Sequence, residues 1–163
     1  MTKKYDKTKQ RVDYFDEGLR YLCREKDLVR KVDAERLSTP WRQKMEAILE
    51  AWQVPGFEGF IQNGYMTKYI KGMDFHGNPV FTMDGKALSC PVDSALKLKV
   101  LPIFAGAIAA GEKTGFTLGD MTCGNLLTDG DEIILIDYDV IVSWPLSLPY
   151  VRLWNRTLRI IFG

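Results

Sequence analysis

The sequence is poor in the residues on which much enzyme chemistry depends. Its 163 residues include one histidine and three cysteines. The cysteines, Cys23, Cys90 and Cys123, are odd in number and far apart, which argues against a disulfide framework and against a paired-cysteine zinc site. The histidine, His76, sits in a turn-like FHGNP setting. This weighs against hydrolases that are built on a Ser/His/Asp or Cys/His arrangement.

An excess of charge and a long apolar run are lacking as well. Because 22 Lys and Arg balance 21 Asp and Glu, there is no sequence-wide basic field, and we expect no nucleic-acid partner. The chain has no signal-peptide pattern and no run of about 18 consecutive apolar residues, so we expect neither a signal peptide nor a transmembrane segment and predict a cytoplasmic location. With 46% apolar residues and no repeat or linker, the sequence predicts one folded domain over residues 1–163.

The first half of the chain shows strand patterns around one helix. Runs with the sequences RVDYF, LRYLC and DLVRKV, within residues 10–33, predict an antiparallel meander. Ser38-Thr39-Pro40 is typical of a helix start, with a hydroxyl at the cap, and predicts a helix over about 39–52. Trp41, Met45, Ile48, Leu49 and Trp52 share one face of that helix. The segment FEGFIQNGYMTKYI then predicts a hairpin that turns at Asn63-Gly64.

The second half is more helical. Residues 72–86 are rich in turn residues around a short apolar run, Pro79 to Met83. Residues 91–110 predict a buried helix with a kink or break at Pro102 and Gly106. The runs NLLT and EIILID, joined by Asp129-Gly130-Asp131, predict a tight hairpin, and LPYVRLWNRTLRIIF predicts a final helix.

The segment 119–139 carries the strongest functional signal. Asp120 is followed five residues later by Asn125, and a hairpin then delivers Asp137 at the end of an apolar strand. Two carboxylates and an amide oxygen around one point are what a hard divalent cation with attached phosphates requires. Phosphoryl transfer depends on positioning and charge neutralisation, so the scarcity of histidine is no obstacle.

These residues, in the stretches GDMTCGN and LIDYD, resemble the GD(x4)N loop and the ID(F/Y)D motif of the protein-kinase-like superfamily. The resemblance is closest to the aminoglycoside phosphotransferase and choline kinase branch or to minimal bacterial effector-type kinases, and it covers roughly residues 10–142. It implies an α+β, compact, two-lobed protein-kinase-like fold. An antiparallel N-lobe sheet would occupy residues 10–71, with the hinge at 68–72, and a strongly shortened helical C-lobe would occupy residues 73–163.

The resemblance also implies roles for the polar residues of the second half. Asp120 would be the catalytic aspartate that orients the acceptor hydroxyl and takes its proton. Asn125 and Asp137 would be the magnesium ligands, and Asp139 would support them.

In the first half of the chain, the resemblance implies which residues bind the nucleotide. Lys31 would bind the nucleotide phosphates, and a glutamate of the following helix would hold it. Glu46 lies closer to the apolar face of that helix than Glu50, so we favour Glu46. The backbone from Lys68 through Tyr69 and Ile70 would bind the adenine edge.

The implied activity is an ATP- and Mg²⁺-dependent kinase that phosphorylates a hydroxyl acceptor, either protein Ser/Thr or a sugar or other small molecule. If the chain is an effector, it would be delivered to a host cytosol. A pseudokinase or nucleotide-binding interaction module is the alternative, because there is no GxGxxG motif, Leu118 replaces the usual histidine, and only 24 residues follow Asp139. The final helix carries Arg152, Arg156 and Arg159 in a stripe. We favour a core helix there over a membrane-surface helix.

Overall fold

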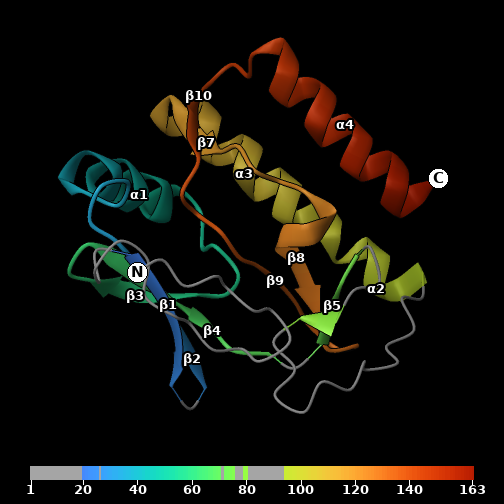
Figure 1. Ribbon diagram of the computed structural model, residues 1–163. Coiled ribbons are helices and arrows are strands. Elements are labelled where there is room, and N and C mark those ends of the chain that lie inside the picture. Colours follow the sequence, from blue (N-terminus) through green and yellow to red (C-terminus); the bar gives the residue numbers. More distant parts are fainter. Residues whose placement is uncertain (1–19, 26, 71, 76–78, 81–93) are drawn as a thin grey trace.

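The structure, a computed structural model, describes residues 20–25, 27–70, 72–75, 79–80 and 94–163 (Figure 1). The predicted strand RVDYF, His76 and most of the turn-rich region after it lie outside the described residues. Within the described part the fold is α+β, with small antiparallel sheets and four α-helices.

The first sheet has four strands in the order β1-β2-β4-β3. Its members are β1 (Arg20–Glu25), β2 (Leu28–Asp33), β3 (Phe57–Ile61) and β4 (Gly64–Lys68), and all neighbours are antiparallel. The hairpin predicted at Asn63-Gly64 is confirmed, with Asn63 in the left-handed region at φ 56°. Gly64 is required there, because a Cβ atom at this position would collide with the backbone carbonyl of Lys31.

Helix α1 (Thr39–Ala51) follows β2, as the sequence predicts. Trp41, Met45 and Ile48 are buried on one face, which confirms the predicted apolar face. The predicted cap is wrong in one respect. Ser38 occupies the cap position in an extended conformation, but its side chain makes no capping hydrogen bond. Pro40 in the first turn, which has no N–H to satisfy, remains the local signal for the helix start.

The remaining strands form a second sheet and a separate pair. The second sheet has the order β6-β5-β8-β9 and comprises β5 (Gly72–Asp74), β6 (Pro79–Val80), β8 (Leu126–Thr128) and β9 (Ile133–Leu135). Its β8–β9 hairpin was predicted. The pairing of β7 (Phe116–Leu118) with β10 (Ile141–Ser143) was not predicted, and it brings the two ends of the motif-bearing segment together.

The predicted long helix is divided into α2 (Ser94–Leu98) and α3 (Val100–Thr114). The break precedes Pro102, which lies in the first turn of α3 and has no N–H to continue the helix. Gly106 causes no break. It allows close packing instead, because a Cβ atom there would collide with the indole of Trp52.

The span Ser94–Thr114 is long and apolar enough to cross a membrane by length and composition alone. A core helix of a soluble protein passes the same test, and α3 has a buried face that includes Val100, Phe104 and Ala107. The last helix, α4 (Leu148–Phe162), runs beside α3 (Figure 1). Phe104 of α3 meets Trp154 of α4 edge to face, with ring centroids 5.5 Å apart.

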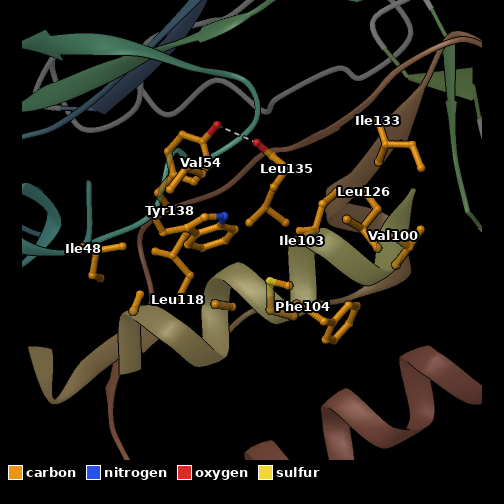
Figure 2. Packing of buried hydrophobic residues seen from close by; sticks show 14 of the residues in the cluster. Ile48, Val54, Val100, Ile103, Phe104, Leu118, Leu126, Ile133, Leu135 and Tyr138 are labelled. Atoms are coloured by element: carbon orange, nitrogen blue, oxygen red, sulfur yellow. Dashed lines mark hydrogen bonds between the residues drawn. The ribbon is translucent and has the colours of Figure 1, made fainter. Parts of the chain in front are cut away.

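Two clusters of buried residues hold these elements together. The larger one joins α1, α3 and α4 to the segment from β7 to Tyr138, and part of it is shown in Figure 2. The smaller one, which we call the inter-sheet cluster, consists of Val29, Ile70, Leu127 and Ile134. It packs β2 of the first sheet against β8 and β9 of the second. The division into two lobes stays a prediction, but this contact fixes which face of β2 looks toward the second sheet.

Candidate active site

Lys31 lies on the face of β2 that looks toward the second sheet. In the register of the first sheet, Lys31 is opposite Tyr65 of β4. Val29, two residues earlier and therefore on the same face of the strand, is buried in the inter-sheet cluster. The side chain of Lys31 is 27% exposed, so its ammonium group is positioned by the sheet and still reachable from solvent.

Asp137 lies directly after the apolar strand β9, as the sequence predicts. Its Oδ1 atom is 3.4 Å from Lys31 Nζ, although 106 residues separate the two positions. Asp137 adopts a left-handed backbone conformation with φ 67°, which turns the chain at the strand end. The preceding residue is fixed as well, because Ile136 N donates to the backbone oxygen of Asn125 at 2.9 Å. The structure therefore brings Lys31 and Asp137 together.

Asp120 and Asn125 are joined within one loop. Asn125 Nδ2 donates to Asp120 Oδ2 and to the Asp120 backbone oxygen, both at 2.9 Å. The short 3-10 turn η2 (Cys123–Asn125) and the strand β8 follow at once. The loop thus holds the amide and the carboxylate against each other.

Two side chains of helix α4 hydrogen-bond to the backbone of this loop. Trp154 Nε1 donates to the backbone oxygen of Gly119 at 3.0 Å, and Thr157 Oγ1 donates to that of Met121 at 2.8 Å. The predicted core role of this helix fits its packing, since Trp154 and Ile161 are buried against the protein. The arginines Arg152, Arg156 and Arg159 are exposed.

The charges of Lys31 and Asp137 both affect the pKa of Asp120. Burial raises the pKa of Asp120, and the charge of Asp137 raises it further, while the hydrogen bond from Asn125 and the charge of Lys31 lower it. A carboxylate with a raised pKa is a better proton acceptor than an ordinary one. These four side chains therefore act on one another electrostatically.

Asp139, which the sequence places in a supporting role, is more central than predicted. Its Oδ2 atom is 2.8 Å from Lys31 Nζ, and its Oδ1 atom accepts a hydrogen bond from Tyr65 OH at 2.8 Å. Burial raises the pKa of Asp139, and Lys31 opposes that effect. Sequence reasoning missed Tyr65 altogether. The one available signal was its β-sheet register opposite Lys31, which depends on the position of the hairpin turn.

The predicted partnership of Lys31 with a glutamate of helix α1 is not formed. Glu46 Oε1 lies 3.1 Å from Arg42 Nε one turn earlier in the helix, and the Glu46 side chain is 51% exposed. Glu50 is exposed as well. The buried face of α1 is occupied by apolar side chains, so its glutamates point to solvent and Asp139 takes the position beside the lysine.

The predicted adenine-binding segment runs from the end of β4 toward β5. Lys68 Nζ forms an ion pair with Glu132 at 2.6 Å, and Tyr69 N donates to the backbone oxygen of Asp27 at 2.8 Å. Ile70 is buried in the inter-sheet cluster. The segment therefore borders the cluster that contains Val29, which lies two residues before Lys31 on the same face of β2.

The donor set suits a hard cation. Both hydrogen bonds of Asn125 are donated by its amide nitrogen, so the amide oxygen keeps the capacity to coordinate. Asp137 adds a carboxylate that is 34% exposed. Within the described ranges, no group of three or more His, Cys, Asp and Glu could hold a metal ion. A cation at Asn125 and Asp137 would therefore need further oxygen ligands from phosphate and water.

An open cavity of about 400 Å³ lies elsewhere, between Trp52, Lys99 and Ile133. It is lined by none of the predicted site residues. Lys99 and Asp131 both line it, and Lys99 Nζ donates to the backbone oxygen of Asp131 at 2.5 Å.

No protein-family profile and no curated protein sequence matches the chain. Among solved structures it is similar to WbdD, with 18% identity and a TM-score of 0.47 over 92% of this chain and 37% of that one. It is also similar to Rio2 kinase from Chaetomium thermophilum, in a complex with ADP/Mg²⁺ and phosphoaspartate, with 16% identity and a TM-score of 0.46 over 93% of this chain and 53% of that one. Both likenesses are distant. The chain spans about a third and about half of the lengths of these two proteins.

Proposed function

We propose that the protein is an ATP- and Mg²⁺-dependent phosphotransferase that moves the γ-phosphoryl group to a hydroxyl acceptor. The observation that carries the proposal is the convergence of Lys31, Asp137 and the Asp120–Asn125 pair, which come from three separate segments of the chain. A cation, two carboxylates and an amide in one place are the protein groups that phosphoryl transfer needs.

Each residue has one task in this proposal. Lys31 would bind the nucleotide phosphates, and the oxygens of Asn125 and Asp137 would hold the magnesium ion. Bound Mg²⁺ would supply neutralisation of the phosphate charge. Asp120 orients the acceptor hydroxyl and receives its proton while the hydroxyl oxygen bonds to the γ-phosphorus. The bond from that phosphorus to the oxygen of the β-phosphate breaks, and ADP leaves.

In the same proposal the adenine binds at the edge of the inter-sheet cluster, whose members are buried against one another. Val29, Ile70, Leu127 and Ile134 are apolar and lie on the Lys31 side of β2. The backbone of Lys68, Tyr69 and Ile70 borders them. Because the N–H groups of Lys68 and Tyr69 already donate to Gly56 and Asp27, the adenine edge would bind to other backbone groups of this segment. The acceptor remains either protein Ser/Thr or a small molecule such as a sugar, and the proposed location is the cytoplasm or, for an effector, a host cytosol.

Thermal melting in the presence of ATP, with and without Mg²⁺, tests nucleotide binding. A ligand that binds only the folded state raises the melting temperature, and we expect a larger rise with Mg²⁺ than without it. No rise in either condition would contradict the proposal.

A phosphate-transfer assay tests the activity itself. Replacing the catalytic base by Asp120→Ala should lower transfer by about 10²–10⁴-fold, and Asp137→Ala should abolish the response to Mg²⁺. Asp131→Ala, which removes an exposed turn carboxylate, is the matched control and should transfer phosphate like the wild type. Equal transfer by all four proteins would refute the site.

The second candidate function is a pseudokinase or nucleotide-binding interaction module that acts through a protein partner. It is favoured by the neutralisation of Lys31, whose ammonium group is paired with both Asp137 and Asp139. A melting shift that does not depend on Mg²⁺, together with no phosphate transfer, would select this candidate.

A further inference from the structure

The carboxylate that holds Lys31 comes from the segment after β9 and not from a helix. Lys31 Nζ is 2.8 Å from Asp139 Oδ2 and 3.4 Å from Asp137 Oδ1. The nearer of the two is the more enclosed, since the side chain of Asp139 is 8% exposed and that of Asp137 is 34% exposed. An ion pair that is shielded from solvent is screened less and holds its geometry better than an exposed one.

The second oxygen of Asp139 is engaged by the sheet. Tyr65 OH donates to Asp139 Oδ1 at 2.8 Å and accepts a hydrogen bond from Tyr138 N at 3.1 Å. The hydroxyl therefore joins β4 to the Asp137–Asp139 segment through the side chain of Asp139 and the backbone N–H of Tyr138.

The ring of Tyr65 cannot move freely. It is 1% exposed, stacks on Trp41 at a centroid distance of 5.5 Å, and lies 4.8 Å from the ring of Tyr138. Because Tyr65 is opposite Lys31 in the sheet, the lysine and the hydroxyl that orients its partner belong to one rigid unit.

We propose that Asp139, oriented by Tyr65, is the positioning residue that fixes Lys31 for the nucleotide phosphates. It takes the part that the kinase resemblance gives to a helix glutamate. This inference rests on the proposed phosphotransferase function. Both oxygens of Asp139 are used by Lys31 and Tyr65, whereas the contacts that Asp137 makes with described residues, Lys31 Nζ and Asp139 N, are both 3.4 Å long. In this proposal Asp139 holds the lysine, and the longer contact from Asp137 to Lys31 leaves the more exposed Asp137 carboxylate accessible to a metal ion.

Nucleotide affinity and magnesium dependence together test this division. Asp139→Asn removes the charge that holds Lys31, and loss of a hydrogen bond to a charged group should raise the KM for ATP by about tenfold or more. The Mg²⁺ concentration at half-maximal activity should stay unchanged. Asp137→Asn should instead raise that Mg²⁺ midpoint. Tyr65→Phe, which deletes only the orienting hydroxyl, should raise the KM for ATP by a smaller factor.

Glu46→Gln is the matched control, because it neutralises the helix carboxylate that the resemblance would select. It should leave the KM for ATP at the wild-type value. The inference is overturned if Glu46→Gln raises this KM as much as Asp139→Asn does, if Asp139→Asn leaves it unchanged, or if Asp139→Asn shifts the Mg²⁺ midpoint as a metal ligand would.

A measurement without nucleotide separates this inference from the proposed function. Urea denaturation of Lys31→Met, Asp139→Asn and the double variant should show non-additive midpoints, with the double variant about as stable as Asp139→Asn alone. Additive midpoints would overturn the pairing even if the wild type is an active kinase. Non-additive midpoints in a protein that neither binds ATP nor transfers phosphate would preserve the pairing, refute the proposed function and overturn the nucleotide-positioning role.

Discussion

Helix α1 and the segment Asp137–Asp139 both carry carboxylates, but these carboxylates differ in exposure and in the partners that they bind. The side chain of Glu46 in α1 is 51% exposed and pairs with Arg42 of its own helix. The side chain of Asp139 is 8% exposed and pairs with Lys31 from a distant strand. An exposed pair one helical turn apart adds little to stability, whereas an enclosed pair between distant segments fixes their relative position.

The difference shows what α1 contributes. Its tie to the Asp137–Asp139 segment is Trp41, whose Nε1 donates to the backbone oxygen of Tyr138 at 2.9 Å. The helix supports the segment through a buried indole and leaves the charged contact to Asp139. A helix in the expected position therefore need not supply the expected charged group.

The largest effect is expected for Trp41→Ala. Removing this buried ring leaves a cavity and an unpaired carbonyl, and it should lower the free energy of unfolding by about 3–5 kcal/mol. Urea denaturation measures this loss. Trp41→Phe, which keeps most of the packing but not the N–H group, should cost about 1–2 kcal/mol. A loss for Trp41→Ala no greater than that of Trp41→Phe would contradict the role given to α1.

Gly106→Ala tests how α1 is seated on α3. Alanine ordinarily stabilises a helix, but a Cβ atom here would collide with the indole of Trp52 just beyond the end of α1. Overpacking should therefore destabilise the protein by about 1–3 kcal/mol. Ala105→Gly, at the exposed neighbouring position of the same helix, is the control and should cost about 0.5–1 kcal/mol. A higher melting temperature for Gly106→Ala would show that the ring moves away without cost.

Tyr138→Phe tests the second of the two regions compared, the segment after β9. Tyr138 OH donates to the backbone oxygen of Leu135 at 2.5 Å in a fully buried setting (Figure 2). Deleting this hydroxyl should lower the free energy of unfolding by about 1 kcal/mol. Chemical denaturation would show a lower midpoint with an unchanged slope, and an unchanged midpoint would mean that packing alone holds the segment.

The smallest effect is expected for Glu46→Gln. Because the Arg42–Glu46 pair is exposed, its loss should change the free energy of unfolding by less than about 0.5 kcal/mol. Thermal melting should show this small difference at low salt and a still smaller one at high salt, because salt screens an exposed pair. A loss of more than about 1 kcal/mol would indicate a buried role for Glu46 that the geometry does not support.

Local sequence signals predicted much of the fold. Asn63-Gly64 and Asp129-Gly130-Asp131 marked their hairpins, and Pro40 marked the start of α1, because each acts on the backbone of its immediate neighbours. The β7–β10 pair was missed, since two strands of three residues each carry no periodicity and meet only through the tertiary fold. The break before Pro102 was predicted to within a few residues, and the break suggested at Gly106 was wrong.

The candidate site was predictable in its members but not in its partnerships. Motif spacing gave Asp120, Asn125 and Asp137, and the resemblance of the run LVRKVD to the lysine strand of the kinase-like family gave Lys31. A helical wheel, however, shows only which side of α1 is apolar, and it could not tell that neither Glu46 nor Glu50 reaches the lysine. The contact from Tyr65 to Asp139 joins positions 74 residues apart, so it depends on sheet register and on the turn at Asp137 together.

The backbone conformation at Asp137 also determines which substitutions the site tolerates in evolution. Asp137 stands at φ 67°, a backbone region that aspartate, asparagine and glycine tolerate and that β-branched residues avoid. Replacement by asparagine or glycine would delete the carboxylate while suiting the backbone as well or better. Lys31 would still be held by Asp139. Under the proposed function, the chain could therefore lose this metal ligand without losing its fold, and descent from an active enzyme to an inactive binding protein would be a short step at this position.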